Sequence, residues 1–175
     1  MKKIICVAMA CVLALSSVLV LSSCSADKLE YELSEDGTYY IVVDTVNAKG
    51  DLVIPDTYKD LPVKEIDDSA FSSNSYLTSI VFPESIEKIG SNAFSLCSSL
   101  ESITIGKNVK ELEDYVFNQA NALKEINYCG TPEQWEALCR YTTYTAPSGE
   151  KKRTSKVADS LDGVKINYNC TMPSN

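Results

Sequence analysis

The side chains that could do chemistry in this chain are carboxylates and cysteines, because the 175-residue sequence contains no histidine. The lack of histidine excludes Ser-His-Asp and Cys-His catalysis in their usual forms, and every metal site with a histidine ligand. The 24 Asp and Glu residues could supply the carboxylate pair of a sugar hydrolase, but no motif singles out a pair. We therefore expect no catalytic residue, no cofactor and no metal site, and we keep a hydrolase only as the least favoured function.

Cys24 stands in a sequence setting that favours covalent modification. A short cationic start precedes an almost wholly apolar stretch over 4–21. This pattern is typical of a signal peptide, although about 18 apolar residues could also span a membrane. The next residues, Leu-Ser-Ser-Cys, resemble a lipobox, in which the cysteine receives a diacylglyceryl group and becomes the new N-terminus. We predict a signal peptide at 1–23, a lipidated tether at 24–28, and a lipoprotein anchored to a membrane outside the cytoplasm, with its domain at the cell surface.

The overall composition is that of an ordinary globular chain, with 45% hydrophobic and 23% charged residues. Removing the predicted signal peptide takes away Lys2 and Lys3 and changes the net charge from −8 to −10. A chain this acidic repels nucleic-acid phosphates, so we expect no nucleic-acid partner. The remaining region, 29–175, is long enough to bury one core.

A period of 23 residues runs through the middle of the chain. The columns that define it most clearly are Phe71, Phe94 and Phe117, and Ile80, Ile103 and Ile126. Periods of 20–29 residues indicate a solenoid, in which each coil buries its apolar side chains against its neighbours. We therefore assign the phenylalanine column to the core rather than to a cofactor site.

Each repeat is predicted to contain a strand, a turn, a second short apolar pair and an Asn/Asp-x-Phe segment, which we call the Phe step. The unit over 77–97 is LTSIVFPESIEKIGSNAFSLC. It closely resembles the bacterial leucine-rich repeats of the BspA type, also called treponemal-type, including the proline after the strand and Gly90. In the flanking units Asp67 and Glu113 replace that glycine. The resemblance covers about 50–139.

The resemblance implies a fold and a broad role. It implies an α/β solenoid, mostly β, built as a short right-handed stack of about four coils over 50–130. It implies that Cys97 is a buried core thiol. From the residues of the repeat themselves, we predict that the Asn/Asp-x-Phe step is a short helical turn. The family includes surface proteins linked to adhesion, host-protein binding and coaggregation, so the resemblance also implies a recognition module.

The two ends of a stacked solenoid leave apolar faces that must be covered. An Asp-Gly pair between two alternating runs predicts an antiparallel hairpin over 29–49 against the first coil. The other end, 131–175, is predicted to hold a helix, a polar loop over 142–160 and a final strand over 164–168. The loop contains Lys151-Lys152-Arg153, a basic run that could bind an anion but is more simply a solvated loop.

The predicted C-terminal helix has the residues of a good start. Thr131 suits the N-cap, Pro132 suits the first helical position, and Gln134 stands where a capping box needs it. Trp135 on this helix is predicted to seal the last coil. An exposed tryptophan platform for a sugar is the alternative.

Three cysteines lie near the predicted C-terminal cap, and export would permit a disulfide there. Cys139–Cys170 and Cys129–Cys170 are both plausible pairs, and one of the three cysteines would stay unpaired. Zinc is disfavoured because there is no Cys-x-x-Cys and the spacings are irregular.

The outward residues of the repeat strands form the candidate binding face. At about 4.8 Å per coil, four coils would give a plate about 20 Å long. Its residues are mixed polar and charged, which is equally the composition of a solvated face. The face comprises Thr78, Ser79, Val81, Glu101, Ser102, Thr104, Lys124, Glu125 and Asn127. A second outward column comprises Lys64-Glu65, Glu87-Lys88 and Lys110-Glu111.

These observations favour a non-catalytic recognition or adhesion module at the cell surface. It would bind a protein or a glycan through the repeat face, and we expect a monomer. The alternative is a structural or assembly component of a cell-envelope complex. The sequence identifies neither the ligand nor the membrane.

Overall fold

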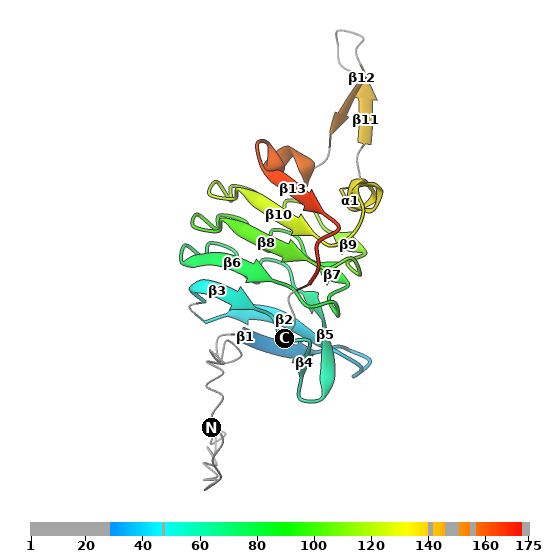
Figure 1. The fold of residues 1–175 in the computed structure, drawn as a ribbon. Helices are drawn as coiled ribbons and strands as arrows, with labels where there is room; N and C mark the ends of the chain where they lie inside the picture. The colour runs from blue at the N-terminus through cyan, green and yellow to red at the C-terminus, as the bar shows by residue number, and fades with distance from the viewer. Residues whose placement is uncertain (1–28, 47, 140–141, 146–150, 155–156, 173–175) are drawn as a thin grey trace, which may run out of the picture.

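Parallel strands from successive coils stack into two sheets (Figure 1). The computed structural model describes residues 29–46, 48–139, 142–145, 151–154 and 157–172. The predicted signal peptide and the tether with Cys24 lie outside these residues. Within the described part, no helix has the length and apolar character needed to cross a bilayer.

The regular secondary structure of the described residues is mostly strand, with one short α-helix and one 3-10 helix. In chain order the elements are β1 (Leu29–Leu33), β2 (Tyr40–Thr45), β3 (Gly50–Val53), β4 (Thr57–Tyr58), β5 (Leu61–Ile66), β6 (Leu77–Val81), β7 (Lys88–Ile89), β8 (Ser102–Ile105), β9 (Glu111–Leu112), β10 (Glu125–Tyr128), α1 (Pro132–Leu138), β11 (Thr142–Thr145), β12 (Lys151–Thr154), η2 (Ala158–Leu161) and β13 (Lys165–Tyr168).

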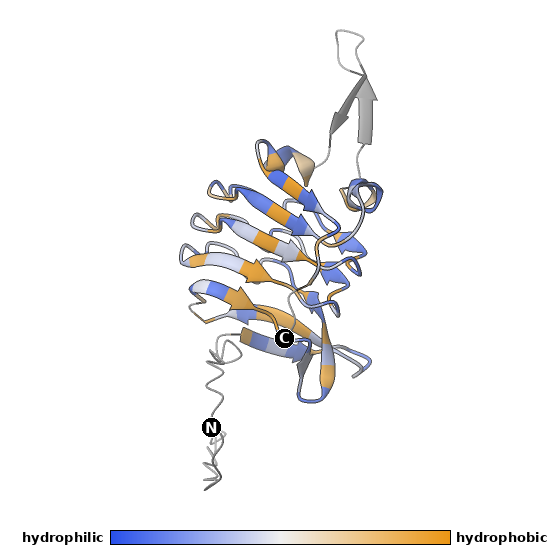
Figure 2. Ribbon diagram, in the orientation of Figure 1, coloured by the Kyte–Doolittle hydropathy of each residue, from blue (hydrophilic) through white to orange (hydrophobic). Residues whose placement is uncertain are grey.

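One sheet has the order β3-β6-β8-β10-β13 and is parallel throughout. Ile80, Ile103 and Ile126 lie in register on adjacent strands and are buried. The residues on either side of each isoleucine along its strand point outward. The same alternation of hydrophobic and hydrophilic residues is visible along these strands in Figure 2. This sheet carries the predicted candidate face.

The other sheet has the order β1-β2-β5-β7-β9, with β4 paired to β5 at its side. Ile66, Ile89 and Leu112 occupy matching positions on β5, β7 and β9 and are buried. The core therefore lies between the two sheets and the turns that join them.

The phenylalanine column forms a row of stacked rings inside the solenoid. The ring centroids of Phe71 and Phe94 are 5.0 Å apart, and those of Phe94 and Phe117 are 6.3 Å apart. All three side chains are buried, so the column is core and not a ligand site.

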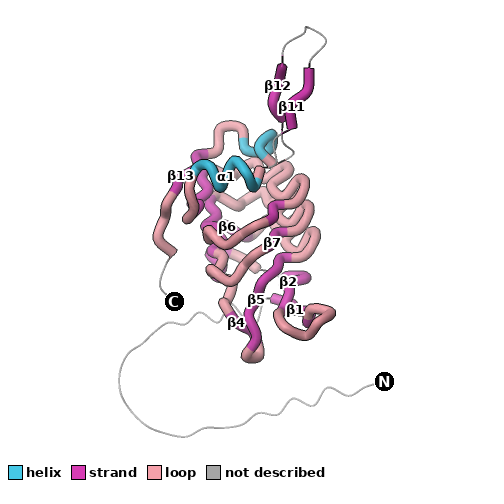
Figure 3. The backbone as a smooth tube through the Cα atoms, turned by 90° about the vertical axis from the view of Figure 1, so that its right-hand side faces the viewer, coloured by secondary structure: helices cyan, strands magenta, loops and turns pink. Residues whose placement is uncertain are grey.

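In each coil, a turn follows the strand of the second sheet. Hydrogen bonds between the turns of successive coils form a ladder beside the ladders of the two sheets, and we call it the third ladder. The Phe71 N–H donates to Ala93 O at 2.9 Å, and the Phe94 N–H donates to Val116 O at 2.8 Å. The N–H groups of intervening residues donate instead three residues back within their own turn. Viewed from the side, these turns lie stacked above one another (Figure 3).

The backbone of this ladder repeats with the sequence period. Two positions in each turn have positive φ although none of them is glycine: Ser69, Asn92 and Tyr115 at one position, and Ser73, Leu96 and Gln119 at the other. These left-handed residues turn alternate N–H groups toward the next coil, which a helical turn cannot do. The prediction of a short helical turn at the Phe step is therefore wrong.

The N-terminal end of the stack is an antiparallel hairpin of β1 and β2, in which Leu33 lies opposite Tyr40. β2 then joins the second sheet by pairing in parallel with β5. The rings of Tyr31 and Tyr58 stack at 4.0 Å, and Tyr40 meets Tyr58 edge-on at 4.9 Å. This aromatic group packs the hairpin onto β4.

At the other end, α1 begins with a complete capping box. The Thr131 hydroxyl accepts from Gln134 N–H, and the Gln134 side chain accepts from Thr131 N–H at 2.8 Å. Trp135 is only 4% exposed and packs on Tyr128, with ring centroids 5.3 Å apart. The burial of Trp135 excludes the exposed sugar platform.

The region predicted as a polar loop over 142–160 contains regular structure. β11 and β12 pair as an antiparallel hairpin, and η2 follows it. The basic run Lys151-Lys152-Arg153 lies on β12. The loop prediction is wrong here because the β-branched and aromatic residues over 142–145 favour a strand.

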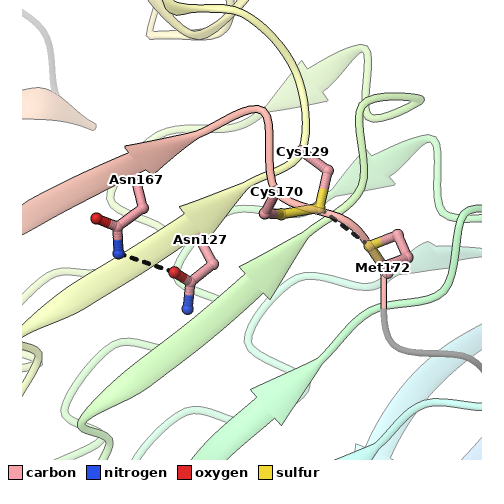
Figure 4. Close-up of a disulfide and its surroundings, with 5 residues drawn as sticks. All are labelled: Asn127, Cys129, Asn167, Cys170 and Met172. Carbon is pink, nitrogen blue, oxygen red and sulfur yellow. Dashed lines mark hydrogen bonds between the residues drawn. A yellow bond between two sulfur atoms is a disulfide. The ribbon is translucent and has the colours of Figure 1, made fainter.

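One disulfide is present in the described residues, and it joins Cys129 to Cys170 (Figure 4). β10 and β13 pair in register up to Tyr128 and Tyr168, so the residues just after them meet, with Cα atoms 4.2 Å apart. The alternative pair Cys139–Cys170 is wrong. Cys139 caps the C-terminus of α1 and is buried.

Candidate functional site

The outward residues of the first sheet form one continuous surface, which we call the strand face. All nine residues predicted for it lie on β6, β8 and β10 or directly before these strands, and none of them is buried. The strand pairings add residues from β3 and β13 that the sequence did not assign to the face: Asp51, Val53, Lys165 and Asn167. Lys165 and Asn167 could have been assigned from the sequence, because residues 166–168 repeat the Ile-Asn-Tyr of residues 126–128.

At the β3 edge of the strand face, hydroxyl groups hold a carboxylate in place. Asp51 accepts hydrogen bonds from the Thr78 hydroxyl at 3.1 Å and the Ser79 hydroxyl at 2.7 Å. These bonds lower the pKa of Asp51, with the Ser79 bond as the largest cause. The edge therefore presents a fixed anion near neutral pH.

At the β13 edge, two amides are bonded in a row (Figure 4). Asn167 Nδ2 donates to Asn127 Oδ1 at 2.8 Å and to Glu125 Oε2 at 3.3 Å. These bonds fix the orientation of both amides. They leave Asn127 Nδ2 as a donor and Asn167 Oδ1 as an acceptor for a ligand.

An ion pair flanks the centre of the strand face. Lys124 Nζ lies 2.8 Å from Glu101 Oε2, and the two side chains are 67% and 54% exposed. A pair this exposed contributes little to stability. Its charges remain accessible to a partner.

The second outward column is a ladder of ion pairs that joins successive coils. Glu87 pairs with Lys64 at 2.9 Å and with Lys110, and Lys88 pairs with Glu113 at 3.1 Å. Hydrogen bonds from Lys110 and Lys64 lower the pKa of Glu87, and the Glu113 carboxylate raises the pKa of Lys88. Because these charges neutralise one another, we assign this column to holding successive coils together. The strand face is therefore the better candidate site.

Two described cysteines, Cys97 and Cys139, are thiols outside the disulfide, and both are buried. Burial raises the pKa of the Cys97 thiol to about 11 and that of the Cys139 thiol to about 12, so neither forms a thiolate near neutral pH. No cluster of three or more potential metal ligands occurs among the described residues. The strand face offers oriented hydroxyls, amides and single charges.

The repeat geometry agrees with a family match over more than half of the chain. The BspA type leucine rich repeat region, in six copies, matches residues 51–144. The chain belongs to the BspA-type leucine-rich repeat family. The strand face is thus the strand side of BspA-type repeats, and α1 lies within the matched region.

Solved structures of bacterial leucine-rich repeat proteins share this fold. A leucine-rich repeat protein of T. pallidum is 24% identical with a TM-score of 0.55, over 59% of this chain and 51% of that one. One from Bacteroides capillosus is 24% identical with a TM-score of 0.52, over 63% of this chain and 90% of that one. One from Bacteroides ovatus is 26% identical with a TM-score of 0.52, over 81% of this chain and 36% of that one.

This chain therefore spans about half of the T. pallidum protein and about a third of the B. ovatus protein. At these identities the likeness establishes the fold. Comparison with curated proteins finds no match.

Proposed function

We propose that this BspA-type chain is a non-catalytic recognition module that binds a protein or a glycan through the strand face. The observation that carries the proposal is the fixed orientation of the polar groups at both edges of the face. Asp51 is held by two hydroxyls, and Asn167 is held by Asn127 and Glu125. Polar groups that are already oriented lose less conformational entropy when they bind a ligand.

The centre of the strand face supports the same reading. On β8, Ser102 lies between Ser79 and Glu125, and Thr104 lies between Val81 and Asn127. Hydroxyls both donate and accept, so this row can bond to sugar hydroxyls or to a peptide backbone. The short plate suits a contact of modest area, which is the weak and transient class of interface.

We further propose that the domain is displayed at the cell surface by lipid on Cys24. The support is the sequence of the first 24 residues together with membership in the BspA-type family. Cys24→Ser is expected to abolish incorporation of labelled palmitate in the producing cell and to release the protein from the membrane fraction. Palmitate incorporation that persists in Cys24→Ser would contradict the lipid anchor.

The binding proposal is tested by solid-phase binding of the chain to immobilised matrix proteins and to a glycan array. Thr104→Arg places a long cation at the centre of the strand face and is expected to weaken binding at least about tenfold. Thr57→Arg, the same substitution at an exposed position on β4 away from the strand face, is the matched control. Equal binding by both variants would remove the strand face as the site, and no ligand above background would contradict recognition itself.

The alternative role, as an assembly component of the cell envelope, uses the same face with a partner from the producing cell. Co-precipitation from that cell's own envelope, with Thr104→Arg as the negative control, separates the two roles. A partner lost in this variant would favour assembly over adhesion to an external ligand.

A further inference from the structure

The third ladder has an open end that points toward the N-terminal side of the stack. In each later turn, a carbonyl accepts from the coil before it, as Ala93 O accepts from Phe71 and Val116 O accepts from Phe94. The equivalent carbonyl of the first turn, 23 residues earlier, belongs to Ala70, and its neighbours in the row belong to Asp68 and Ser72. Among the described residues, no N–H group donates to these three carbonyls.

The first coil is too short to cover this open end. Fourteen residues lead from Ile66 on the second sheet to Ile80 on the first, and the same number leads from Ile89 to Ile103. In the first coil the equivalent residues are Val42, which pairs with Ile66, and Leu52, which pairs with Ile80. Only ten residues lead from Val42 to Leu52. Among the described residues between β2 and β3, no backbone N–H donates to the row of carbonyls, so this shorter connection leaves the row open.

A pocket of about 210 Å³ lies where this turn is missing. Its walls include Asp44, Thr45, Ala70, Asn74 and Tyr76, together with serines of the turn. The described residues that line it include one carboxylate and no lysine or arginine. Tyr76 is 68% exposed, so its ring is available to a ligand.

The chemistry of this pocket is that of an acceptor site. Ala70 and Ser72, whose carbonyls belong to the open row, both line the pocket, and Asp44 supplies an exposed carboxylate. The Asn74 side chain is committed to the fold, because its oxygen accepts from Tyr76 N–H at 2.9 Å and its amide donates to Ala48 O at 3.0 Å. A ligand that fits must therefore bring several donors and a positive charge.

We propose that this pocket binds the guanidinium group of an arginine side chain presented by a partner protein. A guanidinium carries five N–H donors and no acceptor, it is always charged, and it stacks on aromatic faces. It is also more weakly hydrated than an ammonium, so it enters a pocket lined by carbonyls at a lower desolvation cost. Asp44 pairs with its charge, the carbonyls of Ala70 and Ser72 accept its N–H groups, and Tyr76 covers one face.

This site is separate from the strand face, because no residue of that face lines the pocket. Recognition through the pocket therefore stands or falls independently of the binding proposed above.

The test is an NMR titration of the ¹⁵N-labelled full-length chain in mild detergent. The probe is N-acetyl-arginine methylamide, and the matched neutral probe is the citrulline analogue, which has the same shape without the charge. The arginine probe is expected to shift the amide signals of Ala70, Ser72 and Tyr76 in a saturable manner. The citrulline probe is expected to bind at least about tenfold more weakly.

Two variants locate the site. Asp44→Asn and Tyr76→Ala are each expected to weaken arginine binding at least about fivefold while the remaining spectrum stays unchanged. Asp162→Asn, a carboxylate change near the opposite end of the stack, is the control and is expected to have no effect. Equal affinity for arginine and citrulline, insensitivity to Asp44→Asn, or no saturable shift at this pocket would each overturn the proposal.

Discussion

Removal of the Cys129–Cys170 disulfide is expected to destabilise one end of the molecule by about 4 kcal/mol. The bridge closes a loop with a sequence separation of 41 residues. In the chain-entropy treatment a loop of this length costs the unfolded chain about 13 cal/mol/K, which is about 4 kcal/mol at 25 °C. This is a large fraction of the 5–15 kcal/mol that stabilises an ordinary domain.

The position of the bridge predicts where the loss falls. β13 pairs only with β10 among the described strands, and it lies at the end of its sheet. In a repeat protein each coil contacts only its neighbours, so an end unit can open while the rest stays folded. We therefore expect β13 and η2 to lose protection first, and β6 and β8 to change least.

Hydrogen exchange followed by mass spectrometry measures this difference. The comparison is the oxidised chain against the Cys129→Ser/Cys170→Ser double variant, with phosphine-reduced wild type as the control for the serine hydroxyls. Peptides from β13 should exchange much faster in both the variant and the reduced chain. Equal loss of protection in β6, β8 and β13, or unchanged exchange throughout, would refute the local reasoning.

Four other changes test the rest of the architecture. Phe94→Ala removes the middle ring of the stacked row and is expected to lower the free energy of unfolding by about 3–5 kcal/mol, measured by urea denaturation. Leu96→Gly, at a φ of 63° and half-exposed, is expected to raise that free energy by about 1 kcal/mol in the same assay. Iodoacetamide at pH 8 is expected to leave Cys97 and Cys139 unmodified in the native chain and to label both in urea, as read by peptide mapping. The pKa of Glu87 is lower when folded, so its contribution to stability is complete above pH 4.5 and is lost as the pH falls through the folded pKa; Glu87→Gln should flatten that part of the stability curve.

Each of these has a matched comparison. Leu96→Ala keeps a Cβ at the same left-handed position, so a gain as large as that of glycine would show that backbone strain is not the cause. Phe94→Leu fills more of the space than alanine and should cost less, and equal losses would argue against a packing origin. Native labelling of Cys97 would contradict its burial. An identical pH profile in Glu87→Gln and wild type would contradict the ion-pair ladder.

The repeat positions were predictable because one period acts on every column at once. The burial of Ile80, Ile103 and Ile126 follows from a side-chain alternation of two within a strand, and the stacking of Phe71 and Phe94 follows from equal coil length. The capping box at Thr131 was equally readable, because it depends only on residues three apart.

Features that depend on contacts between distant parts of the chain could not be predicted from the sequence. The left-handed residues of the third ladder include Leu96 and Tyr115, which have no local preference for positive φ, so hydrogen bonds between coils must impose it. The choice of Cys129 over Cys139 depends on the register between β10 and β13. The pocket beside Tyr76 arises from the shorter path between β2 and β3, which no local motif marks.

Equal coil length in all three ladders has a consequence for how such a protein changes in evolution. An in-frame duplication of one unit would insert a coil whose every backbone bond finds the partner that the original coil had. Both caps would then meet the same neighbours as before, and the strand face would lengthen by about 4.8 Å. The reach of the binding surface is thus set by copy number, while its chemistry is set by the few outward residues of each copy.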